Sequence, residues 1–109
     1  MIVELLAAAV LAPGTYCSPS GDLCYGIRKE RGAIVFRIDT FARYFGRYTL
    51  CVTSPKRRVC GDFPMFRNGP LWSSSVRWQR QFPNDGRGRY RVSWRTSTGP
   101  LGPTLTFRR

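Results

Sequence analysis

Two cysteines within residues 47–63 constrain the fold of this chain more than any other feature. If Cys51 lies opposite Cys60 on neighbouring strands, the register of the pair is fixed and residues 54–57 form a two-residue turn. Pro55 suits the first central position of such a turn, because its ring holds φ near about −65°. This stretch therefore predicts a β-hairpin closed by a disulfide bond.

The same register divides the hairpin side chains between two faces, because side chains alternate along a strand. One face holds the cross-strand pairs Val52–Val59 and Tyr48–Phe63, which are apolar and suited to a core. The opposite face holds the alternate positions Thr49, Cys51, Cys60 and Asp62. Apolar pairing and cross-linking thus predict the same register.

The other two cysteines, Cys17 and Cys24, are then left to pair across a short loop. Each bridge is expected to stabilise the fold by about 2–3 kcal/mol, because it restricts the unfolded chain. The alternative is a zinc site, but the cysteine spacings are wider than those of the usual zinc knuckles and the chain has no histidine. Disulfide bonds in turn predict an oxidising compartment.

Chain length and the N-terminus predict one secreted domain. A chain of 109 residues suits a single domain with a modest core. Residues 1–12 form an apolar run like that of a signal peptide and too short to cross a bilayer, although Glu4 interrupts it. The alternative is an N-terminal helix packed on the domain. The predicted organisation is a signal-peptide-like segment at 1–12, a disulfide-closed cap at 13–24 and a β-sandwich domain at 25–109, in an extracellular protein without a transmembrane span.

Alternation of apolar and polar residues predicts further strands. Residues 33–39 alternate in this way, as do residues 72–80 and 88–95. Residues 64–71 are rich in Pro, Gly and Asn and predict a loop that joins one sheet to another. About seven short strands joined by Gly/Pro turns, without sustained helical periodicity, predict an all-β fold, a small antiparallel sandwich.

The segment Gly86-x-Gly88-x-Tyr90-x-Val92 resembles the start of the sixth strand in immunoglobulin-like and fibronectin type III-like modules of bacterial secreted proteins. The resemblance implies an immunoglobulin-like β-sandwich in which the Tyr90 hydroxyl hydrogen-bonds the backbone upstream of its strand. Val92 stands where antibody domains have a cysteine, so their inter-sheet disulfide is not expected. More broadly, the chain is similar to small exported actinobacterial proteins of unknown function, a likeness that implies no activity.

The formal net charge of +12 is carried almost entirely by arginine. Such a charge attracts polyanions, and the planar guanidinium group suits two-point contacts with phosphate or carboxylate. The alternative is that the charge reflects an arginine-rich proteome and keeps the domain soluble. The candidate anion-binding residues occupy outward positions of predicted strands, which strand pairing is expected to merge into one basic face: Arg37, Arg77, Arg89, Arg91 and Arg95.

Nucleic acid is the less favoured of the anionic partners. Proteins that bind single strands stack the bases on aromatic side chains beside the basic residues. The aromatic residues of the alternating segments fall instead on the predicted core face, namely Trp72, Trp78, Tyr90 and Trp94. A domain of this size needs such rings to bury enough apolar area.

Side chains that usually carry catalysis are scarce in this chain. The absence of histidine removes the Ser-His-Asp and Cys-His arrangements and the most common general base. All four cysteines are predicted to be oxidised, which leaves no thiol nucleophile. The carboxylates form no pair or motif suited to sugar hydrolysis: Asp22, Glu30, Asp39, Asp62 and Asp85. The sequence predicts a protein that is not an enzyme and that uses no metal or cofactor.

We therefore predict a secreted, non-catalytic, monomeric module that binds or sits at the cell envelope, with an anionic envelope polymer or another protein as its partner. The alternative is a protease inhibitor or secreted effector that presents the hairpin loop at residues 51–60. In that case Lys56 and Arg57 would serve as a trypsin-like recognition site on a rigid loop.

Overall fold

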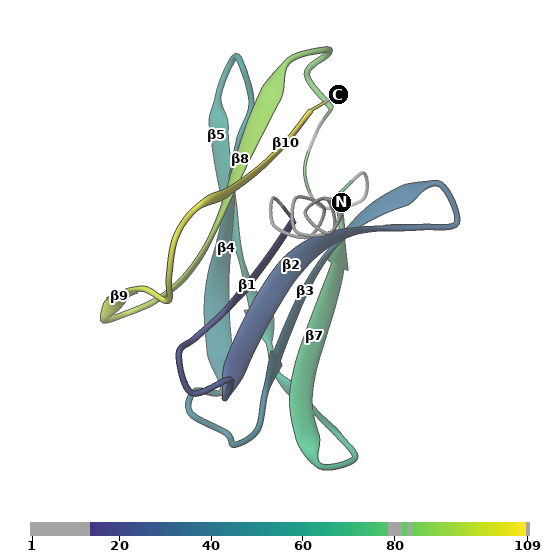
Figure 1. Cartoon of the computed structure of the whole chain (residues 1–109). Coiled ribbons are helices and arrows are strands. Elements are labelled where there is room, and N and C mark those ends of the chain that lie inside the picture. Colours follow the sequence, from purple (N-terminus) through teal and green to yellow (C-terminus); the bar gives the residue numbers. More distant parts are fainter. Residues whose placement is uncertain (1–13, 79–81, 83, 109) are drawn as a thin grey trace, which may run out of the picture.

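Two antiparallel sheets make up the described part of the protein (Figure 1). The computed structural model describes residues 14–78, 82 and 84–108. The signal-peptide-like segment predicted at residues 1–12 lies outside these residues. The all-β class and the antiparallel pairing predicted from the alternation are confirmed, since every pair of neighbouring strands runs antiparallel.

Each sheet is built from strands that are distant in the sequence. The first sheet has the order β1 (Thr15–Cys17), β2 (Leu23–Glu30), β3 (Ala33–Thr40), β7 (Leu71–Arg77) and β6 (Phe66–Asn68). The second sheet has the order β10 (Leu105–Arg108), β8 (Arg89–Thr96), β4 (Arg47–Thr53) and β5 (Arg58–Pro64), and β9 (Gly99–Pro100) pairs with β8 beside this path. The chain therefore enters each sheet twice: β1–β3 and later β6–β7 build the first sheet, and β4–β5 and later β8–β10 build the second.

The hairpin predicted from the two cysteines is present as β4 and β5. Cys51 lies opposite Cys60, and the flanking pairs are Val52–Val59 and Tyr48–Phe63. The backbone N–H of Ser54 donates to the carbonyl of Arg57 over 2.8 Å, which closes the two-residue turn. The predicted register, turn and face assignment of this hairpin are confirmed.

Both predicted disulfide bonds are formed. Cys51 is bonded to Cys60 and Cys17 to Cys24, and each bridge joins residues that face each other across a hairpin. The Cys17–Cys24 bridge ties the edge strand β1 to β2. Each sheet therefore carries one covalent cross-link between adjacent strands.

The described residues contain ten strands where the alternation predicted about seven. Residues 64–71, predicted as a loop, instead leave the second sheet after Pro64, bury Met65 and enter the first sheet as β6. Gly69, with a φ of 63°, allows the tight turn into β7. Three-residue strands such as β1 and β6 are too short for alternation to be visible in a sequence.

Aromatic rings from both sheets form the core between them. The predicted core residues Trp78, Tyr90 and Trp94 are at most 1% exposed, whereas Trp72 is only partly buried and packs against the edge of the core. Trp94 of the second sheet stacks on Tyr25 of the first with ring centroids 4.2 Å apart. These stacked rings hold the two sheets together by contacts that neither sheet could make by itself.

Tyr90 makes the backbone hydrogen bonds that the resemblance implied. Its hydroxyl donates to the carbonyl of Gly86 over 2.7 Å and accepts from the N–H of Asp85 over 2.9 Å. The rest of the side chain is buried against Trp78 and Phe107. This single side chain thus fixes the entry of the chain into β8.

Replacing Tyr90 by phenylalanine is expected to lower the free energy of unfolding by about 1–2 kcal/mol, because Gly86 and Asp85 lose a partner while the ring stays packed. Guanidinium unfolding monitored by tryptophan fluorescence measures the loss. Thr106→Val, at an exposed position of β10, is the matched control and should change stability by less than about 0.5 kcal/mol. Equal stability of the Tyr90→Phe variant and the wild type would contradict this role.

Candidate anion-binding face

Arginines dominate the outward positions of the second sheet. Strands β4, β5, β8 and β10 carry six arginines and one carboxylate, that of Asp62. Alternation with the buried residues of these strands directs all six arginines away from the core. We call the outer surface formed by these six arginines the basic face: Arg47, Arg58, Arg89, Arg91, Arg95 and Arg108.

Strand register brings three of these arginines together around β4. Thr53 lies opposite Arg58 of β5 on one side and opposite Arg91 of β8 on the other. Arg95 lies two residues after Ser93 on β8, so its side chain points to the same face, and it is paired with Thr49 of β4. Strands are spaced about 4.8 Å apart, so the backbones at Arg58 and Arg91 are about 10 Å apart and their long side chains can reach a common ligand.

A hollow of about 350 Å³ lies at this meeting point. The residues that carry its polar character are Arg58, Arg91, Arg95, Thr53, Ser93 and Thr104. No described carboxylate lines it, and the segment from Pro100 at the end of β9 to Thr104 before β10 forms its wall through Pro100, Gly102, Pro103 and Thr104. We call this the arginine hollow. Guanidinium and hydroxyl donors without a competing carboxylate suit a phosphate, sulfate or carboxylate group.

The wall of the arginine hollow is held against the core. The Tyr25 hydroxyl donates to the carbonyl of Pro103 over 2.6 Å, and the backbone N–H of Leu101 donates to the backbone carbonyl of Trp94 over 2.9 Å. A Cβ atom on Gly102 would lie 2.6 Å from the Tyr25 hydroxyl and 2.7 Å from the Tyr16 ring, so only glycine allows this approach. These contacts fix the position of the wall in the absence of a ligand.

Burial, with a smaller contribution from Tyr16, raises the pKa of Tyr25 well above its ordinary value. The phenol therefore remains protonated, and continues to donate to Pro103, through the whole physiological pH range. The position of the wall does not depend on pH in that range.

The charges in the arginine hollow have no neutralising carboxylate within the described part of the chain. Across residues 14–78, 82 and 84–108, the guanidinium groups of Arg58, Arg91 and Arg95 form no ion pair with a carboxylate. By contrast, Arg37 and Arg57 are each paired with an aspartate, at 2.9 Å and 3.0 Å. Three unpaired guanidinium groups around one hollow produce a local positive potential that favours an anionic ligand.

Two of the five predicted anion-binding residues lie elsewhere. Arg89, Arg91 and Arg95 share the basic face, whereas Arg37 and Arg77 belong to β3 and β7 of the first sheet. The expected merging into one face fails because β3 pairs with β2 and β7 and does not pair with β8.

Arg37 is also occupied by an internal ion pair. Its guanidinium donates two hydrogen bonds of 2.9 Å to Asp39. Desolvation opposes the ionised form of Asp39, but the hydrogen bonds from Arg37 and Ser73 outweigh it and lower the pKa of this carboxyl. Arg37 is thus committed to a neighbour on its own strand.

Sequence reasoning missed Arg47, Arg58 and Arg108 as members of the basic face. The predicted hairpin register already contained the information for Arg58, because it places this residue opposite Thr53 on the same side as the cysteines. Arg108 could not be assigned in this way, because its neighbour across the strands is Arg89 of β8. That pairing depends on how distant strands associate.

The hairpin tip that carries Lys56 and Arg57 is fastened to the loop before β8. The Nε and Nη2 atoms of Arg57 each donate to Asp85 over 3.0 Å, and the Ser54 hydroxyl donates to the same carboxylate over 2.7 Å. These hydrogen bonds, from Arg57 first and Ser54 second, lower the pKa of Asp85. Lys56 is exposed at the tip, while Arg57 is engaged within the protein.

Comparison with models of protein families, with curated proteins and with solved structures gave no match. Among the described residues, no cluster of three or more His, Cys, Asp or Glu side chains could hold a metal ion. No helix in the same part of the chain has the length and apolar character needed to cross a membrane. The fold and the basic face define a small, disulfide-linked, all-β protein.

Proposed function

We propose that this protein is a secreted, non-catalytic binding module of the cell envelope, and that the basic face binds anionic polymers through the arginine hollow. The single observation that carries this proposal is the group of three guanidiniums that share one hollow without a carboxylate partner among the described residues. Secretion is supported by the two disulfide bonds, which persist in oxidising compartments.

The proposal includes an immunoglobulin-like arrangement of the sandwich. In that fold, strands A, B, E and D form one sheet, and strands C, F and G form the other. The order β2-β3-β7-β6 corresponds to A-B-E-D, and the order β4-β8-β10 corresponds to C-F-G. On this assignment Tyr90 begins strand F, where the tyrosine corner of such domains occurs.

A polymer that presents charges without bases fits the basic face better than single-stranded nucleic acid does. The outward positions of β4, β5, β8 and β10 hold arginine, threonine, serine, cysteine, aspartate and proline, and no aromatic side chain. Proteins that bind single strands gain much of their affinity by stacking bases on aromatic rings. An acidic polysaccharide or a phosphate-containing envelope polymer needs only the charges and the donors.

Replacing Arg58, Arg91 and Arg95 together by serine is expected to weaken binding to heparin at least about tenfold, because three charge-assisted contacts of about 0.5–1 kcal/mol each are lost. The salt dependence should also become shallower, since fewer counterions are released on binding. Titration of fluorescein-labelled heparin at several salt concentrations measures both effects.

The matched control removes the same charge from the other sheet. Replacement of the exposed Arg28, Lys29 and Arg77 by serine also lowers the net charge by three and leaves the arginine hollow intact. This control variant should bind heparin nearly as well as the wild type. Equal weakening in the two triple variants would show that overall charge governs binding, and would overturn the proposed site.

A further inference from the structure

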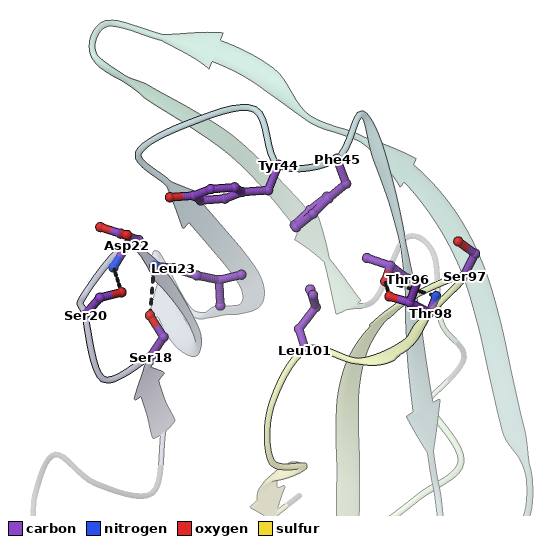
Figure 2. Close-up of a pocket in the computed structure, with 10 residues that line it drawn as sticks. All are labelled: Ser18, Ser20, Asp22, Leu23, Tyr44, Phe45, Thr96, Ser97, Thr98 and Leu101. Atoms are coloured by element: carbon purple, nitrogen blue, oxygen red, sulfur yellow. Dashed lines mark hydrogen bonds between the residues drawn. The ribbon is translucent and has the colours of Figure 1, made fainter.

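A second hollow lies at one end of the sandwich, among turns that the basic face does not use. Residues of the β1–β2 turn, of the connection from β3 to β4 and of the β8–β9 turn line this hollow together. The hollow is open to solvent and has a volume of about 510 Å³ (Figure 2), within the range of about 300–1,000 Å³ typical of small-molecule sites. We call this space the end hollow.

The end hollow has an apolar surface of rings and leucines. Figure 2 shows Tyr44 and Phe45 along one side, with the Leu23 and Leu101 side chains beneath them. Tyr44 remains 55% exposed, so much of its ring is open to solvent and can contact a ligand. An exposed aromatic ring next to a hollow offers a flat, electron-rich face on which C–H groups of a ligand can pack.

Polar groups line two opposite flanks of the same space. Asp22 lies on one flank with Ser18 and Ser20, and residues 96–98 contribute hydroxyl groups on the other (Figure 2). The serine oxygens accept from the backbone N–H groups of Leu23 over 3.3 Å and Asp22 over 3.4 Å. Their hydroxyl hydrogens therefore remain available to a ligand, because a hydroxyl can donate and accept at once.

The charge of the end hollow is opposite to that of the arginine hollow. Among the residues that the structure describes, its lining contains the Asp22 carboxylate and no lysine or arginine, in a chain whose net charge is +12. Partial desolvation, with smaller contributions from Asp22, raises the pKa of the Tyr44 phenol. A neutral ligand rich in hydroxyl donors would meet an acceptor here.

We propose that the end hollow binds the ring of an uncharged sugar residue. The C–H face of a pyranose would pack on Tyr44 and Phe45, and its hydroxyls would donate to Asp22 and exchange hydrogen bonds with the surrounding serine and threonine side chains. A purely apolar ligand would bury Asp22 without a partner, and a purely polar ligand would leave the rings unused. A sugar satisfies both surfaces at once.

This site is independent of the basic face, although the two hollows share one segment of chain. Leu101 lines the end hollow, while its neighbours Pro100 and Gly102 line the arginine hollow. The segment that separates the two hollows is fixed by the hydrogen bonds of Leu101 and Pro103 to the core. Either site can therefore be removed without displacing the other.

Titration of the ¹⁵N-labelled full chain with neutral hexasaccharides of glucose and of N-acetylglucosamine tests the proposal by NMR. At least one of these probes should shift the amide signals of Leu23, Tyr44 and Leu101. Tyr44→Ala is expected to weaken this binding about tenfold, and Asp22→Asn by a similar factor, because each removes a main contact. The affinity should hardly change between about 0.05 and 0.5 M salt, unlike heparin binding.

Phe66→Ala is the matched control, since Phe66 is 62% exposed but lies on β6, away from the end hollow. This variant should bind the sugar as the wild type does. Three results would overturn the proposal: no shift with either sugar at millimolar concentration, equal weakening by Phe66→Ala, or shifts at these residues with hexanol and not with sugar. Because Arg58, Arg91 and Arg95 do not line the end hollow, their triple variant should keep sugar binding whether or not the basic face binds heparin.

Discussion

Replacement of Trp94 by alanine is expected to lower the free energy of unfolding by about 3–5 kcal/mol, the range measured for large aromatic residues in well-packed cores. Trp94 is fully buried, stacks on Tyr25 at 4.2 Å and meets the edge of Phe36 at 6.4 Å. Both partners belong to the first sheet, so the substitution opens a cavity between the sheets. A small domain with a typical stability of about 5–10 kcal/mol would lose much of it.

Chemical unfolding followed by circular dichroism measures this loss, and Trp94→Phe is the informative companion variant. Phenylalanine retains a ring against Tyr25 and removes the indole N–H, which has no hydrogen-bond acceptor among the described residues. The phenylalanine variant should therefore lose much less stability than the alanine variant. If the two variants were equally destabilised, the stacked ring would not be the source of the inter-sheet contact energy.

Joint replacement of Cys51 and Cys60 by serine is expected to lower the free energy of unfolding by about 2–3 kcal/mol. The bond restrains the hairpin of β4 and β5, and β4 pairs on its other side with β8 at the middle of the second sheet. Losing the restraint enlarges the set of unfolded conformations for a segment that contributes Tyr48, Leu50 and Val52 to the core. Thermal and guanidinium unfolding of the double variant measure the loss.

The corresponding double variant at Cys17 and Cys24 provides the comparison. The two bridges span similar sequence separations, 7 and 9 residues, so loop entropy would give nearly the same loss for both. Strand β1, however, has three residues, and among the described strands it pairs with β2 alone, at the edge of its sheet. We expect a smaller global loss with faster hydrogen exchange confined to β1 and its neighbour on β2. Equal global losses would contradict this distinction.

Local sequence patterns predicted those parts of the fold in which the partners are close in the chain. The β4–β5 hairpin is the main case, because its cysteines, its valine pair and its proline turn all require one register. The core-facing residues of β8 were predicted equally well, since Tyr90, Val92 and Trp94 alternate with polar residues and are all fully buried. In both segments the energetic preference of each side chain agrees with that of its neighbours.

The short strands β1 and β6 were not predictable from alternation, because three residues contain too little of the pattern. The end hollow was also not visible in the sequence. The turn that carries Asp22 was predicted only as part of a cap, and Tyr44 was not singled out. These residues become neighbours because three separate turns fold to the same end of the sandwich.

The sequence by itself determined the register of the cysteine hairpin, the two disulfide partners and the buried phase of the longer strands, because these depend on alternation and on contacts within a short span of chain. Only the tertiary structure decided which arginines share a surface. Arg91 and Arg58 flank Thr53 of β4 on its two sides, and Arg37 lies in the opposite sheet, because long-range strand pairing assigns each strand to a layer. A strand has the same alternation of apolar and polar residues in either sheet, so no local pattern predicts to which sheet it belongs.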